Sequence, residues 1–144
     1  MKLFTAIAFI LTLTSCATQA KYSDEVMYDM ASVLKDVTQA VDGELKFGET
    51  SGLSNEEIIV KAMSSNPKLL TRLPELATEG KVAHYRILSE FQGDNAVMLI
   101  CDGDIALMED AGCNAAFDKV YWKSPQPNTC NITLDAAAIC ANQL

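Results

Sequence analysis

The chain has 144 residues, of which 49% are hydrophobic and 21% charged, and its formal net charge is −8. This length supports one domain with a real core and is short for two, and the composition is that of a folded protein rather than a disordered one. The acidic excess, with no cluster of Lys or Arg, disfavours nucleic-acid binding and electrostatic adsorption to anionic lipid.

The first fifteen residues predict a secretory signal peptide. Lys2 supplies a positive charge, and a nearly unbroken apolar run extends from Leu3 to Leu13. This run is shorter than the roughly 20 apolar residues that a transmembrane helix needs. Residues 1–15 are therefore not expected to be part of the folded domain.

The end of this segment is Leu13-Thr14-Ser15-Cys16: an aliphatic residue, two small residues and a cysteine. It resembles the lipobox of bacterial lipoproteins. The resemblance implies that Cys16 receives a diacylglyceryl group on its sulfur, becomes the first residue after cleavage, and anchors the protein through acyl chains such as palmitate. Ala17 replaces the Asp that favours inner-membrane retention in that family, so the resemblance implies the periplasmic face of the outer membrane.

The predicted layout is a signal peptide at 1–15, a tether at 16–22 and a single globular domain at 23–144. Loss of the signal removes Lys2 and leaves a net charge of −9. The alternative is ordinary cleavage after Ala20, which would discard Cys16 and leave a soluble periplasmic or secreted protein.

The five cysteines support the same reading. Once Cys16 is assigned to lipid, an even set remains, consisting of Cys101, Cys113, Cys130 and Cys140. The set contains no CxxC pair, so structural disulfides are favoured over a redox or zinc site. Three pairings are open. We favour Cys101 with Cys113 and Cys130 with Cys140, because short loops close most easily.

Helices are predicted in the first half of the domain. An apolar face repeats at helical spacing over 23–41, after a Ser23 N-cap, and Gly43 is expected to end this helix. A second helix is expected at 55–64. A short third helix at 67–73, and a turn at 74–78, would follow before Gly80.

The pattern then becomes that of strands. Residues 82–109 are rich in β-branched and aromatic side chains and are interrupted by "QGDN" and "DG", so they predict a three-stranded antiparallel meander with a type I′ turn at Asp102-Gly103. The fold class is therefore α+β, with N-terminal helices packed on a small sheet and a C-terminal part held by disulfides. An all-α fold is the alternative. A last short helix is expected before Cys140.

Candidate chemistry is sparse. His84 could act as a general base, but a lone histidine in a strand is more often a surface residue. Calcium could bind an acidic group made of Asp94, Asp102, Asp104, Glu109 and Asp110, although the EF-hand template fails. Tyr85, Phe117, Tyr121 and Trp122 could form an aromatic platform, but core packing is favoured.

No catalytic, cofactor or metal site is therefore predicted, and the domain shows no signature of a named family. We expect a lipid-anchored protein with a binding or scaffolding role, whose partners are the membrane through its lipid and, as a candidate, a basic protein. One alternative is an inhibitor or immunity-type protein of a cationic cell-wall hydrolase, which the acidic charge would help to attract. Another is a small envelope hydrolase that uses acidic residues.

Overall fold

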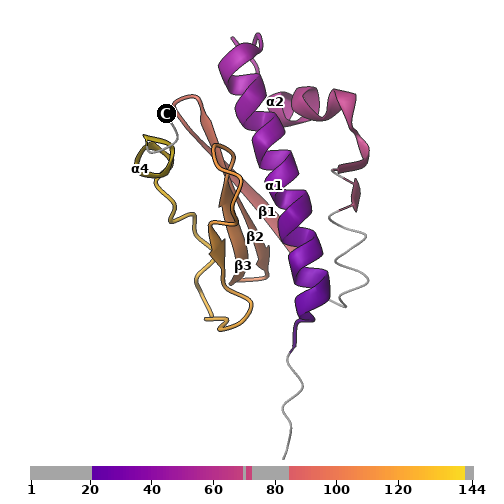
Figure 1. The fold of residues 1–144 in the computed structure, drawn as a ribbon, viewed down its shortest axis with the longest axis vertical. Coiled ribbons are helices and arrows are strands. Elements are labelled where there is room, and N and C mark those ends of the chain that lie inside the picture. The colour runs from indigo at the N-terminus through magenta and orange to yellow at the C-terminus, as the bar shows by residue number, and fades with distance from the viewer. Residues whose placement is uncertain (1–20, 70, 73–84, 142–144) are drawn as a thin grey trace, which may run out of the picture.

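The protein has an α+β fold, as predicted, in which a long helix packs on a four-stranded antiparallel sheet (Figure 1). The computed structural model describes residues 21–69, 71–72 and 85–141. The predicted signal peptide, Cys16, His84 and the turn at 74–78 lie outside the described residues. No helix within the described ranges is both long enough and apolar enough to cross a membrane.

Helix α1 (Asp24–Phe47) begins after Ser23, as predicted, but continues past Gly43 and ends at Gly48. The predicted end was wrong because a glycine inside a helix costs only about 1 kcal/mol, which tertiary contacts can outweigh. One such contact is the ion pair between Glu44 and Lys61, 2.6 Å apart. The buried face of α1 carries Met27, Met30, Val33, Leu34, Val37 and Val41.

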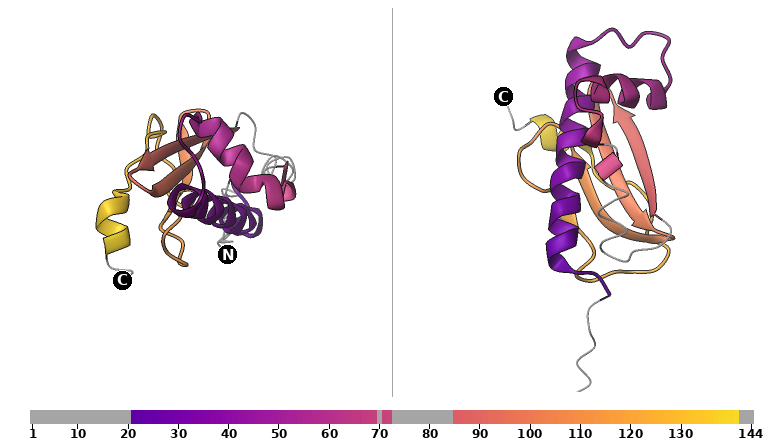
Figure 2. Two further views of the ribbon diagram at one scale, coloured as in Figure 1. Left: turned by 90° about the horizontal axis from the view of Figure 1, so that it is seen from above. Right: turned by 90° about the vertical axis from the view of Figure 1, so that its right-hand side faces the viewer.

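Helix α2 (Asn55–Ala62) lies beside α1 and is followed by one 3₁₀ turn, η1 (Met63–Ser65) (Figure 2). It begins with a capping box, in which Ser54 Oγ accepts from the Glu57 amide and Glu57 accepts from the Ser54 amide. Ile58 and Met63 are buried against the core. Residues 68, 69, 71 and 72 are helical, in agreement with the predicted third helix.

The meander consists of β1 (Tyr85–Gln92), β2 (Asn95–Asp102) and β3 (Ile105–Ala111), in sequence order. This confirms the predicted strands and makes the all-α alternative wrong. A short fourth strand that was not predicted, β4 (Lys119–Val120), pairs with β3. The register places Val97 opposite Ala111 and Leu99 opposite Glu109.

Both hairpins turn on a two-residue Gly-Asp loop. Gly93 has φ 64° and Gly103 has φ 58°. Among the described residues, Asn128 is the only non-glycine residue with a positive φ. A type I′ turn needs positive φ at both loop positions, and Asp104 does not provide it. The predicted Asp-Gly turn is therefore wrong by one position: the loop is Gly103-Asp104, with the glycine first.

The two faces of the sheet are covered by different parts of the chain. Ala96, Met98 and Ile100 face α1, while Val97, Leu99 and Cys101 face the C-terminal segment 130–140. A β-bulge between Ile100 and Cys101 adjusts the register. The C-terminal segment ends in α4 (Ala136–Cys140), capped by Asp135 as expected for the short terminal helix.

Two disulfides hold this segment, but their pairing differs from the prediction. Cys101 bonds Cys130, and Cys113 bonds Cys140, with Cα separations of 5.9 and 5.6 Å. Cys101 lies opposite Ala106. From Ala106 the strand continues to Ala111, about 17 Å away at 3.3 Å per residue, and Cys113 lies in the turn beyond that end. The short separation in sequence does not bring Cys101 and Cys113 together, because the extended strand β3 keeps them apart.

Candidate functional site

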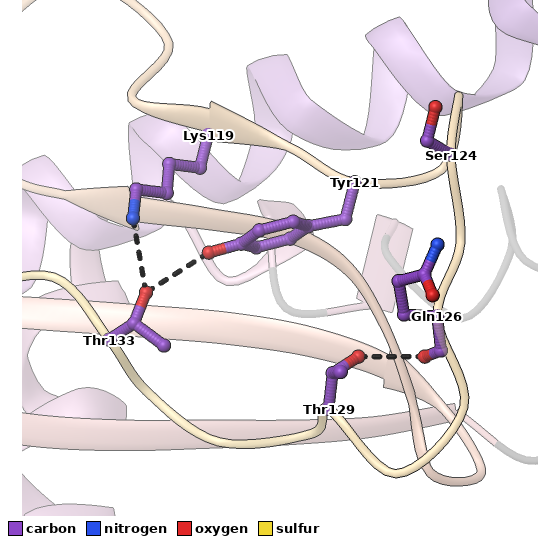
Figure 3. A pocket seen from close by; sticks show the side chains of 6 residues that line it. All are labelled: Lys119, Tyr121, Ser124, Gln126, Thr129 and Thr133. Carbon is purple, nitrogen blue, oxygen red and sulfur yellow. Dashed lines mark hydrogen bonds between the residues drawn. The ribbon is translucent and has the colours of Figure 1, made fainter.

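The outer face of the sheet carries a hollow of about 320 Å³ between β4 and the segment that follows it. Each of its lining residues carries a polar group on its side chain; they are Lys119, Tyr121, Ser124, Gln126, Thr129 and Thr133 (Figure 3). The Tyr121 ring points from the strand side toward Thr133, and Gln126 lies on its other side. The hollow exists because the Cys101–Cys130 disulfide brings the chain back across the sheet.

One buried carboxylate holds the floor of this region together. Glu109 is 1% exposed and accepts from the amides of Thr133 (2.6 Å) and Leu134 (2.7 Å). It also accepts from the hydroxyls of Thr133 (2.9 Å) and Tyr121 (2.8 Å). With four donors on one carboxylate, Glu109 is occupied by structural hydrogen bonds and does not serve as a free base.

Tyr121 is likewise a hydrogen-bonding group rather than an acid. Burial, together with the hydrogen bond to Glu109, raises the pKa of Tyr121 to about 12, while the hydrogen bond with Thr133 lowers it. The phenol therefore stays protonated at neutral pH. Lys119 Nζ lies 3.3 Å from Thr133 Oγ1 and supplies the one cation among the lining residues. The hollow thus offers hydroxyl and amide groups around an aromatic ring.

A second hollow of about 340 Å³ lies on the other side of the same chain segment. It is lined by Arg86, Asp104, Asn128, Cys130 and Asn131. Arg86 donates to the Gly103 carbonyl at 2.9 Å and pairs with Asp104 at 3.3 Å. The charges of Arg86 and Asp104 are already paired with each other. We therefore take the first hollow as the better candidate for a ligand-binding site.

The acidic residues singled out from the sequence do not converge. Asp102 binds Lys21 (2.7 Å) and the Tyr22 hydroxyl (2.9 Å), Asp104 pairs with Arg86, and Asp110 contacts Lys35. Within the described ranges, no group of three or more His, Cys, Asp or Glu side chains is placed to hold a metal ion. The calcium alternative therefore has no support among these residues.

Of the aromatic residues singled out from the sequence, Trp122 packs in the core as expected, whereas Phe117 is exposed. Trp122 is buried, donates to Asp24 at 2.9 Å, and meets the Tyr28 ring edge-on at 5.1 Å. Phe117 stacks on the Tyr28 ring, with 6.2 Å between the ring centroids. Only Tyr121 belongs to the hollow. Its other lining residues were missed because no local pattern marks them; the proline-bordered loop was the sole signal in the sequence.

A second polar cluster lies between α1 and β3. Lys35, 5% exposed, contacts Asp110, 3% exposed, and donates to the Ala111 carbonyl at 2.8 Å and to Asn114 Oδ1 at 3.0 Å. Asp118 Oδ2 lies 3.5 Å from Lys35 Nζ. Burial raises the pKa of Asp110 to about 7, an effect that Lys35 opposes and Asp118 adds to.

Fold and site together define a small α+β protein, with one long helix on one face of an antiparallel meander and a disulfide-fixed segment with a polar hollow on the other. Comparison of the chain with protein-family models, curated proteins and solved structures finds no match.

Proposed function

We propose that this protein is a lipid-anchored protein of the bacterial envelope that binds a polar ligand in the outer-face hollow. The anchor is inferred from the lipobox-like residues that end at Cys16. The two disulfides support an oxidising compartment, because such bonds persist outside the cytoplasm. The periplasmic face of the outer membrane is the location that the lipobox resemblance favours.

The observation that carries the binding role is the composition of the hollow. Three hydroxyl side chains, one amide and one ammonium surround the Tyr121 ring, while Glu109 beneath them is already saturated. Such walls suit an uncharged ligand that has hydroxyl and amide groups and a carbon face to stack on the ring. We therefore propose an N-acetylated saccharide as the ligand class.

The hollow lies at the end of the domain nearest the proposed anchor. The Lys21 and Tyr22 side chains are held by Asp102 at the end of β2. Beside that end, the Thr129 amide donates to the Asp104 carbonyl at 2.9 Å. A ligand bound there would sit near the lipid surface, at a site presented by a rigid sheet.

The alternatives have narrower support. An inhibitor of a cationic cell-wall hydrolase is supported by the net charge alone. For a hydrolase, the nominated acids from Asp102 to Asp110 are each held by a side-chain or backbone partner, which is a poor arrangement for a general base.

Both parts of the proposal can be tested on one preparation of the full chain made in a bacterium. We expect the N-terminal peptide to begin at Cys16 and to carry acyl mass, and Cys16→Ala to abolish that mass and release the protein from membranes. We also expect a trisaccharide of N-acetylglucosamine to shift the Tyr121 and Thr129 resonances, and Ser124→Ala with Gln126→Ala to weaken binding about tenfold.

Thr50→Ala, far from the hollow in sequence and absent from its lining, is the matched control and should bind normally. An unmodified chain that starts at Lys21 would refute the anchor. Saturation by a neutral peptide, with no response to the saccharide, would overturn the ligand class.

A further inference from the structure

The Lys35 cluster places an amine and a carboxyl group together in a water-poor site. Lys35 comes from the middle of α1 and Asp110 from β3, so residues 75 positions apart meet inside the core. Both side chains are more than nine-tenths buried, and Lys35 Nζ is in direct contact with Asp110 Oδ1. Few ion pairs bury both members so fully, because the loss of hydration is expensive.

Burial changes the chemistry that this pair can undergo. In water the pair is an ammonium and a carboxylate, and neither reacts with the other. Transfer of one proton from the ammonium to the carboxylate would leave two neutral groups, an amine beside a carboxylic acid, and a water-poor site tolerates neutral groups better than separated charges. The raised pKa of Asp110 agrees with this tendency. A desolvated lysine amine is an effective nucleophile.

A third group is placed to move protons. Asp118 Oδ2 lies 3.5 Å from Lys35 Nζ and influences Asp110 as a hydrogen-bonding neighbour. Its own orientation is fixed, because it accepts from the Ala111 amide at 2.7 Å and from Asn114 Nδ2 at 2.6 Å. The Ala111 carbonyl and Asn114 Oδ1 also accept hydrogen bonds from the Lys35 nitrogen and fix its position.

We infer that Lys35 and Asp110 become joined by an intramolecular amide bond between Nζ and Cγ. The amine attacks Cγ, Asp118 takes a proton from the nitrogen and passes it to the departing hydroxyl, and one water leaves. One C–N bond and one O–H bond of the departing water form while one C–O bond and one N–H bond break, so no oxidant, reductant or cofactor is required. Fixed contact between the groups supplies the high effective concentration that the condensation needs.

The inference is tested on the full chain, by digestion of the reduced and alkylated protein with trypsin. Free Lys35 would allow cleavage and give separate peptides 22–35 and 87–119. The amide predicts instead that 22–46, uncut at Lys35, stays joined to 87–119, with a mass lower than their sum by one water. Fragmentation should place the link at Asp110. Lys35→Arg and Asp110→Ala should each abolish the joined species.

Lys46→Met is the matched control, because Lys46 is also an α1 lysine paired with an aspartate, Asp42, at 2.6 Å. This variant should retain the link, now between peptides 22–61 and 87–119 because the tryptic site at position 46 is lost. Asp118→Asn should reduce the yield of the joined species at least tenfold. Separate peptides in full yield from the wild-type chain would overturn the inference, even if no variant folds. A deficit of one ammonia, which would mean a link through Asn114, or a link located at Asp118 would overturn it as well.

Discussion

The side chain of Glu109 shows how a single residue can organise the outer face. The amides of Thr133 and Leu134 lie where the chain crosses the sheet, and they donate to the Glu109 carboxylate instead of to the carbonyl groups of a neighbouring strand. It also fixes the Tyr121 hydroxyl that borders the hollow. A buried amide without an acceptor is costly, so the charge at this position has a structural reason that does not involve catalysis.

Glu109→Ala should therefore lower the stability of the whole domain. It leaves the buried Leu134 amide, the partly buried Thr133 amide and the Tyr121 hydroxyl without this acceptor, and we expect the free energy of unfolding to fall by about 3 kcal/mol. Urea denaturation followed by circular dichroism measures this change. Glu49→Ala, at an exposed position, is the control and should change stability by less than about 0.5 kcal/mol. Equal effects of the two substitutions would contradict the role of Glu109.

At the scale of elements, the contact between α1 and the end of β3 is set by a glycine. A Cβ atom on Gly112 would lie 2.4 Å from the Thr38 carbonyl oxygen and 2.7 Å from Asp42 Cβ. The Gly112 amide also donates to the Ala96 carbonyl at 3.0 Å, and the Ala96 amide donates to Asp42 at 3.2 Å. The helix backbone thus rests directly on the sheet at this point.

Two glycine substitutions should have opposite effects. Gly112→Ala forces α1 away from the sheet and should lower the free energy of unfolding by about 2 kcal/mol. Gly43→Ala, within α1 and facing open space, should raise it by about 0.5–1 kcal/mol because alanine is the better helix former. Thermal and urea denaturation of both variants give the comparison. Destabilisation by Gly43→Ala would show that the helix does not extend through this position.

Most of the elements could be predicted because their causes are local. The capping box at Ser54, the β-branched and aromatic runs of the strands and the turn-forming residues between them depend on residues within a few positions of one another. The hollow and the Lys35 cluster could not be predicted, because they form only where segments distant in sequence meet. The disulfide pairing failed for the same reason: loop length was considered, whereas the direction of β3 decided the partners.

At the scale of the whole molecule, covalent bonds fix the C-terminal segment across the sheet at both of its ends. Cys130 holds it beside the turn between β2 and β3, and Cys140 holds it at the opposite end, beyond β3. The two loops close over 29 and 27 residues, so each bridge contributes about 3.5 kcal/mol by the chain-entropy model. A domain of this size gains much of its stability from two such bonds.

The pairing can be checked by digestion without reduction. Cleavage after Glu109 separates Cys101 from Cys113, cleavage before Asp118 separates Cys113 from Cys130, and cleavage before Asp135 separates Cys130 from Cys140. We expect the peptide with Cys101 to remain bonded to the peptide with Cys130, and likewise Cys113 to Cys140. Mass spectrometry of the denatured, alkylated protein identifies the pairs, and a Cys101–Cys113 peptide would contradict the fold as described.

The docking of Lys21 on Asp102 has a consequence for what this molecule can reach. If acyl chains hold Cys16, the five residues to Lys21 extend at most about 17 Å, whereas α1, at 24 residues, is about 36 Å long. The helix then acts as a rigid spacer between the lipid surface, near its first residue, and the solvent around its last residue. In the proposed arrangement the hollow lies near the lipid surface, whereas Phe47, 89% exposed at the other end of α1, lies a helix length further from it and is open to contact with other molecules.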